Sequence, residues 1–161
     1  MKWSADPAIL KDPVHFFAFG FGAGLLPKAP GTAGTLVAIP IVMLVAACGW
    51  QVHALFAAVA VLVGIPLCGA SARRLGVHDH PGIVWDEIAG YLITMLAVPA
   101  TWQWLIAGFV LFRFFDILKP WPIREADHSL TGGLGIMLDD VIAGLFAGAI
   151  LFAMHHYWPL S

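Results

Sequence analysis

Long apolar stretches alternate with short polar joints along this chain of 161 residues. A helix rises about 1.5 Å per residue, so it needs about 20 residues to cross a hydrocarbon core about 30 Å thick. Residues 35–50 and 52–72 carry no charge and come close to this length, with a turn between them at Gly49-Trp50-Gln51. Residues 136–158 form a third stretch, which ends in histidines and aromatic residues typical of a membrane interface. The pattern predicts an all-α, polytopic membrane helical bundle.

Two further apolar stretches do not fit a single span. Residues 88–115 are too long for one helix and are interrupted at Pro99, which removes a helix donor and restricts the residue before it. We expect a hairpin of two shorter helices here, either crossing fully or entering the bilayer as a shallow, re-entrant pair. Residues 14–26 are short and glycine-rich, which favours an interfacial or re-entrant segment. The total is about four to five membrane helices.

Composition supports a location in lipid. The chain is 60% hydrophobic and 11% charged, against about 25% charged in an average soluble domain. We expect a single integral-membrane domain over residues 1–161, with an interfacial segment and glycine-rich loop in 1–34 and the helices in 35–158. Residues 1–15 carry Asp6, Asp12, two prolines and no apolar run, unlike a signal peptide, so the N-terminus is expected to be retained. Cys48 and Cys68 both lie in apolar stretches, which indicates neither a disulfide framework nor a zinc site.

Charge is confined to one side of the predicted membrane. Counting spans from the N-terminus places residues 1–34, 73–87 and 113–139 on the same side, and these loops hold all eight Lys and Arg. The positive-inside tendency makes this side cytoplasmic. Acidic residues gather at the same helix ends, so the pattern indicates chemistry at the cytoplasmic membrane surface.

Two acidic pairs lie at the starts of apolar helices. Asp86 and Glu87 precede the hairpin, and Asp139 and Asp140 lie at or inside the start of the last helix. Ionised acids in apolar surroundings are costly unless they are paired or bind a cation, and oxygen ligands alone suit Mg²⁺. For Asp86 and Glu87 the alternative is that they only stabilise the helix dipole.

A short internal repeat accompanies these acids. Asp86-Glu87-Ile88-Ala89-Gly90 and Asp140-Val141-Ile142-Ala143-Gly144 each place an acid four residues before a glycine. The two glycines would let the helix starts approach closely and bring the carboxylates together, although helix packing alone would also account for them.

Basic residues accompany the acids. Arg113, Asp116 and Lys119 are spaced by three and share one helix face before Pro120 ends that helix. In the functional interpretation Asp116 binds metal, while Arg113, Lys119 and Arg124 hold an anionic group such as a phosphate. The alternative is a salt-bridged helix end at the interface.

Residues 20–35 form a glycine-rich stretch that includes Lys28 and Thr32. Its backbone donors would cradle an anion at the start of the following helix, or it is merely a turn. It lacks the spacing of a Walker A motif.

Taken together, Gly31-Thr32-Ala33-Gly34-Thr35, Trp85-Asp86-Glu87 and the stretches 112–123 and 133–140 closely resemble the phosphatidylglycerophosphatase A family. The resemblance covers almost the whole chain. It implies a hydrolase of the bacterial inner membrane that requires Mg²⁺ and removes the terminal phosphate of phosphatidylglycerol phosphate. It also implies a functional core with phosphate-side helpers: Asp86, Glu87, Asp116, Lys119, Asp139 and Asp140, with Arg113, Lys28 and Thr32 as the helpers.

These residues suggest a mechanism. Mg²⁺ bound by the acids would activate a water molecule, and Arg113 and Lys119 would neutralise charge on the phosphoryl group. Asp86, Asp116, Lys119 and Asp140 are the expected catalytic residues. An aspartyl-phosphate intermediate remains an alternative route.

Three other classes of protein compete with a phosphatase. A small ion or solute transporter would place its acids nearer the bilayer midplane. A lipid head-group transferase would carry four spaced Asp residues on consecutive helix turns, a pattern that this sequence lacks. A purely structural membrane protein would give no reason for five acids at neighbouring helix ends. The expected partners are a phospholipid substrate and the membrane, not nucleic acid.

Overall fold

The structure is a computed structural model that describes residues 6–77, 80–121, 123 and 131–158. In this part of the chain, helices are joined by loops and no strand is present, which confirms the all-α prediction. Three short helices come first: η1 (Pro7–Lys11), α1 (Pro13–Ala18) and η2 (Gly20–Leu25). The elements that follow are α2 (Pro30–Ala47), α3 (Trp50–Leu75), α4 (Trp85–Thr94), η3 (Met95–Ala97), α5 (Trp102–Leu118) and α7 (Gly133–Tyr157).

The helices differ in their capacity to cross a membrane. Among the described residues, α2, α3 and α7 are long and apolar enough to do so. α5 has 17 residues, about the lower limit for a span. α4 has only 10 residues and rises about 15 Å, half the thickness of the hydrocarbon core. The break expected at Pro99 is confirmed, because η3 ends at Ala97 and α5 begins at Trp102.

Four helices begin earlier than the sequence predicted. α3 starts at Trp50 rather than at residue 52, so the turn before it is shorter than expected, and α4 starts at Trp85 rather than at residue 88. α2 starts at Pro30 rather than at residue 35, and α7 starts at Gly133 rather than at residue 136. Proline fits the first position of a helix because its missing N–H has no partner there in any case. Ala29 turns the chain into α2 with a left-handed φ of 49°. Part of the predicted glycine-rich loop is therefore the first turn of a helix.

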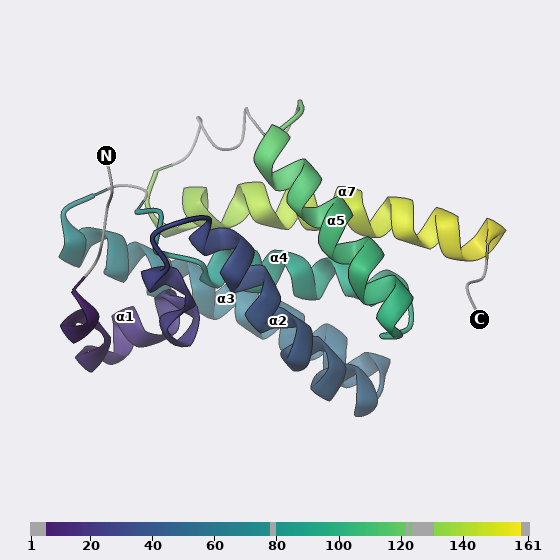
Figure 1. The fold of residues 1–161 in the computed structure, drawn as a ribbon, viewed down its shortest axis with the longest axis horizontal. Coiled ribbons are helices and arrows are strands. Elements are labelled where there is room, and N and C mark those ends of the chain that lie inside the picture. The colour runs from purple at the N-terminus through teal and green to yellow at the C-terminus, as the bar shows by residue number, and fades with distance from the viewer. Residues whose placement is uncertain (1–5, 78–79, 122, 124–130, 159–161) are drawn as a thin grey trace.

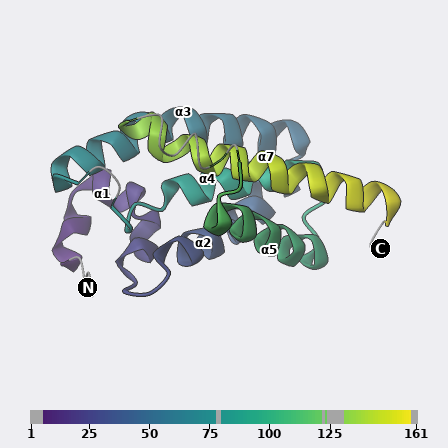
Figure 2. The same cartoon turned by 90° about the horizontal axis from the view of Figure 1, so that it is seen from above.

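α4 lies in the middle of the bundle. Figure 2 shows α3 and α7 along one side of it and α2 and α5 along the other. Tyr91 and Leu92 of α4 and Trp104 of α5 are fully buried. The Tyr91 hydroxyl donates a hydrogen bond of 2.8 Å to the Leu105 carbonyl, which ties α4 to α5. A short helix is thus held among longer ones (Figure 1), and Asp86 and Glu87 lie in its first turn.

The N-terminal helices pack against the end of α3. The His15 ring and the Ser71 hydroxyl form a buried hydrogen bond of 2.8 Å. Arg74 donates to Asp12 at 2.7 Å and 2.5 Å. α1 and η2 have six residues each, so neither crosses a bilayer alone, as expected for residues 14–26. Ser, His and Asp side chains also occur together at the active sites of hydrolases. Here Ser71 is completely buried, so we interpret Asp12, His15 and Ser71 as contacts that attach α1 to α3.

Candidate active site

Three helices bring charged side chains to one cavity of about 290 Å³. The start of α4 contributes two acids, the end of α5 contributes an acid and two bases, and the second and third turns of α7 contribute two more acids. The backbone at the start of α2 closes another side, through Ala29, Pro30 and Gly31. The charged residues that line the cavity are Asp86, Glu87, Arg113, Asp116, Lys119, Asp139 and Asp140.

The carboxylates form two overlapping groups. One oxygen from each of Asp86, Glu87 and Asp140 lies within 4.8 Å of the others, and the same holds for Asp116, Asp139 and Asp140. Magnesium binds oxygen at about 2.1 Å, so oxygens on opposite sides of the ion are separated by about 4.2 Å. Each group is therefore close to the size of a cation-binding site. Asp140 belongs to both.

Several oxygens of these acids lack hydrogen-bond partners within the part of the chain that the structure describes. They are Oδ1 of Asp86, Oε2 of Glu87 and Oδ1 of Asp140, and all three are inaccessible to solvent. Asp140 as a whole is only 2% exposed. Burial of an ionised carboxylate is costly without a counter-charge, and an all-oxygen donor set suits a hard divalent cation. These residues fit Mg²⁺.

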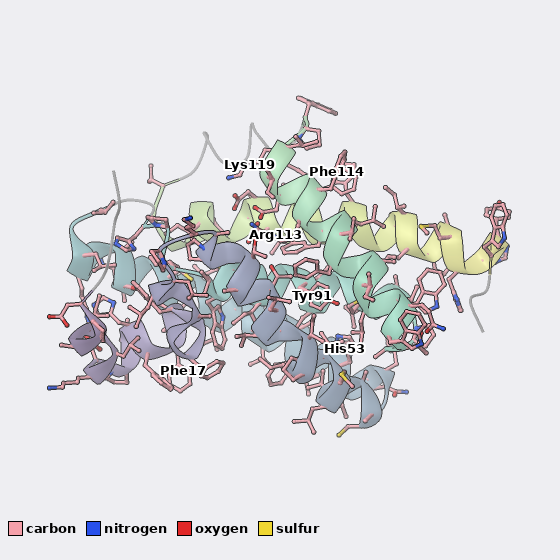
Figure 3. The ribbon with its side chains drawn as sticks, viewed as in Figure 1. Phe17, His53, Tyr91, Arg113, Phe114 and Lys119 are labelled. Atoms are coloured by element: carbon pink, nitrogen blue, oxygen red, sulfur yellow. The ribbon has the colours of Figure 1, made fainter. Side chains whose placement is uncertain are left out.

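The two basic residues already neutralise part of the cluster. Arg113 Nη1 lies 2.5 Å from Asp116 Oδ2 and 3.8 Å from Glu87 Oε1. Lys119 Nζ donates to Asp139 Oδ2 at 2.7 Å. Both bases lie on the side of α5 that faces α2 and the start of α7, as Figure 3 shows. Cations at the edge of an acidic cluster are well placed to hold a phosphate above it.

Lys119 owes its position to the end of α5. The helix stops at Leu118, and Lys119 adopts a left-handed φ of 41° before Pro120. This conformation is uncommon for a residue with a Cβ atom and often marks a functional position. The sequence predicted both the end at Pro120 and the shared position of Arg113, Asp116 and Lys119 at one site.

A pair of glycines brings α4 and α7 together, as the repeated sequence predicted. A Cβ atom on Gly144 would lie 2.4 Å from the Gly90 carbonyl oxygen, and one on Gly90 would lie 2.7 Å from the Asp140 carbonyl oxygen. Only a hydrogen side chain permits this separation. The close approach places Asp140 beside Asp86.

Gly31 belongs to a motif noted in the sequence, but it was not predicted as a site residue. A Cβ atom there would lie 2.0 Å from Glu87 Oε1 and 3.0 Å from Arg113 Nη1. Because Gly31 is in the first turn of α2, its N–H belongs to the helix end that carries partial positive charge. The signal in the sequence was Pro30-Gly31 after a turn, which is typical of a helix start.

The other predicted phosphate contacts are Lys28, Thr32 and Arg124. Lys28 is exposed, and neither Lys28 nor Thr32 lines the cavity, although Ala29, Pro30 and Gly31 between them do. Thr32 lies in the first turn of α2, which begins at Pro30, rather than in a loop wrapped around an anion. The phosphate contacts of Lys28 and Thr32 stay predictions. Arg124 lies outside the described residues.

Comparison with known proteins identifies the family of this chain. The sequence model of the family described as phosphatidylglycerophosphatase A matches residues 16–155. The chain belongs to the phosphatidylglycerophosphatase A family. Proteins named phosphatidylglycerophosphatase A from Escherichia coli (strain K12) and Haemophilus influenzae are each 47% identical to it over 153 residues. These alignments cover 94% of this chain and 89% and 93% of the two relatives.

A third relative of this phosphatidylglycerophosphatase A family member has a different name. It comes from Bacteroides thetaiotaomicron and is provisionally named a phosphatidylinositol-3-phosphatase. It is 39% identical over 137 residues, which cover 80% of this chain and 84% of the relative. No solved structure matches the chain.

Proposed function

We propose that the chain is a Mg²⁺-dependent lipid phosphatase that converts phosphatidylglycerol phosphate and water to phosphatidylglycerol and inorganic phosphate. Family membership supports the phosphatase activity and the lipid substrate. The observation that supports the metal is the pair of carboxylate groups that share Asp140. The confinement of all eight Lys and Arg to one set of loops supports a site facing the cytoplasm from a bacterial inner membrane.

In this proposal the acids hold one or two metal ions, Asp86 and Glu87 with Asp140 on one side and Asp116 and Asp139 with Asp140 on the other. Bound Mg²⁺ would supply charge stabilisation and a more acidic water molecule. The terminal phosphate lies against Arg113, Lys119 and the first N–H groups of α2, which together offset its negative charge.

Proton transfer falls to the cavity's own carboxylates. A carboxylate oxygen of the cavity that does not bind the metal accepts a proton from the attacking water. Water adds to phosphorus, the bond to the glycerol oxygen breaks, and that oxygen takes up the proton that the carboxylate accepted and becomes the hydroxyl of phosphatidylglycerol. In a phosphorothioate analogue made chiral at phosphorus with two oxygen isotopes and hydrolysed in water of the third, direct attack by water inverts the phosphorus centre. Retention would instead indicate two displacements through an aspartyl phosphate.

The decisive assay uses purified protein in detergent with phosphatidylglycerol phosphate, in the presence of Mg²⁺ or of a chelator. Inorganic phosphate is expected only with Mg²⁺. Asp140→Asn should reduce the rate by about 100-fold or more, the scale of losing one group that stabilises the transition state. Asp6→Asn makes the same chemical change at an exposed N-cap far along the chain and should keep full activity. Full Mg²⁺-dependent activity in a folded Asp140→Asn protein would contradict the proposed role.

The same assay addresses head-group selectivity. The relative from Bacteroides thetaiotaomicron is named for another lipid phosphate monoester, so phosphatidylinositol 3-phosphate is the natural competing substrate. We expect phosphatidylglycerol phosphate to react faster, because the relatives named for it are more similar to this chain. A transporter or a head-group transferase would release no phosphate from either lipid.

A further inference from the structure

Ile117 occupies an unusual place in the candidate active site. It lines the charged cavity, yet 66% of its surface is exposed. The other bulky apolar residue in the described lining, Ile83, is only 3% exposed. Ile117 therefore lies at the rim, where the cavity meets the outer surface of α5.

The cavity is too small for a whole phospholipid. Its volume of about 290 Å³ is at the lower end of the range for small-molecule sites, roughly 300–1,000 Å³. This space suits a phosphorylated head group. The hydrocarbon chains of a lipid phosphate have to lie outside the cavity, on a surface that continues from its rim.

α5 offers such a surface. Ile106, Val110 and Ile117 are separated by four and seven residues, so they lie on one face of the helix. Ile106 and Val110 are each 58% exposed. From Ile106 to Ile117 the helix rises about 16 Å, close to the 15 Å or so of hydrocarbon in one leaflet. An apolar stripe one leaflet long thus ends at the charged cavity.

We infer that Ile117 is a specificity-determining residue that contacts the acyl chain of the substrate where the chain leaves the cavity, with Val110 and Ile106 contacting the chain farther along α5. The lipid enters sideways from the leaflet along α5. This inference rests on the proposed phosphatase function. Ile117, Val110 and Ile106 then select a lipid over a soluble phosphate monoester. The charged residues of the cavity recognise the phosphate that both substrates carry.

The test compares KM and kcat for three substrates in detergent micelles with Mg²⁺: long-chain phosphatidylglycerol phosphate, its short-chain form and the soluble head group without chains. Ile117→Asn should raise KM for both lipids about tenfold, equivalent to about 1.4 kcal/mol. It should leave kcat, and the activity on the head group alone, unchanged. Val110→Asn should raise KM for the long-chain lipid only, because a short chain does not reach it.

Leu118→Asn is the matched control. Leu118 is the next residue of α5, is similarly exposed at 61% and does not line the cavity, so its KM values should match the wild type. Ile117→Leu should restore normal kinetics because it restores the apolar contact. Wild-type kinetics in Ile117→Asn, an equal loss in Leu118→Asn, or an equal loss on the soluble head group would each overturn the inference. If the wild-type protein released phosphate from none of the three substrates, the proposed function itself would instead be refuted.

Discussion

Replacing Gly31 with alanine would place a methyl group against the candidate metal site. The added Cβ atom would lie 2.0 Å from Glu87 Oε1, whereas ordinary contacts begin at 3.4 Å. One of the two groups must therefore move by about 1.4 Å. The Cβ is fixed by the first turn of α2, so we expect the Glu87 carboxylate to move away from Asp86 and Asp140.

A displacement of this size should lower the catalytic rate more than it lowers the stability of the folded protein. A misplacement of about 1 Å can lower a rate about 100-fold, and we expect a loss of that order in kcat/KM for phosphatidylglycerol phosphate. Alanine in a helix is favoured over glycine by roughly 0.5–1 kcal/mol, so the folded protein should remain about as stable as the wild type. Phosphate release and thermal unfolding in the same detergent measure the two effects separately.

A double-mutant cycle gives the sharper test. Glu87→Asp shortens the side chain by one methylene group and makes room for the methyl group at position 31. The double variant should therefore be more active than the product of the two single effects predicts. Full activity in Gly31→Ala, or strictly additive losses in the double variant, would show that Gly31 does not position Glu87.

Two further predictions concern packing and pH. Gly144→Ala should destabilise the protein by about 1–3 kcal/mol, because its Cβ would lie 2.4 Å from a backbone oxygen of α4. Gly148→Ala, whose nearest such contact is 3.3 Å, should cost less in the same thermal unfolding measurement. The hydrogen bonds from Arg74 hold the pKa of Asp12 below its usual value, so the attachment of α1 to α3 is strongest above the usual Asp pKa and weakens as the pH falls through the lowered one. Protection of residues 13–25 against hydrogen exchange, relative to the intrinsic exchange rate at each pH, should fall at acidic pH in the wild type, and Asp12→Asn should remove that dependence. The same pH profile in the variant as in the wild type would contradict the assignment.

The fold was largely predictable because helices that lie in a membrane leave a strong pattern of apolar residues in the amino-acid sequence. Uncharged stretches of about 20 residues are typical of membrane helices and rare in soluble domains, and Pro99 marked the break in the hairpin. The repeated acid-to-glycine spacing also predicted a real contact, between Gly90 and Gly144. These features depend on residues that are close in sequence or follow one helical period.

Much of the site depended on contacts that no local pattern contains. Gly31 and Glu87 are far apart in sequence, and only the packing of α2 against α4 and α5 brings them together. The prediction that Lys28 and Thr32 face the phosphate assumed a loop, because glycine-rich sequences favour loops more often than helices. Pro30 is instead the first residue of α2, so only the assumption of a loop at residues 30–34 was wrong. The sharing of Asp140 between two groups of acids could be seen only in three dimensions.

The shortness of α4 has a consequence for the permeability of the bilayer. α4 ends at Thr94, and beyond it a second hollow of about 670 Å³ opens at the opposite end of the bundle, lined by Met95, His53 and their neighbours. The protein is thus indented from both ends, and a thin belt of tightly packed side chains, Tyr91, Leu92 and Trp104 among them, separates the two hollows. A phosphatase in a membrane has to admit water to its reaction centre without letting protons and ions leak across, and completely buried side chains between the two hollows would block such a path.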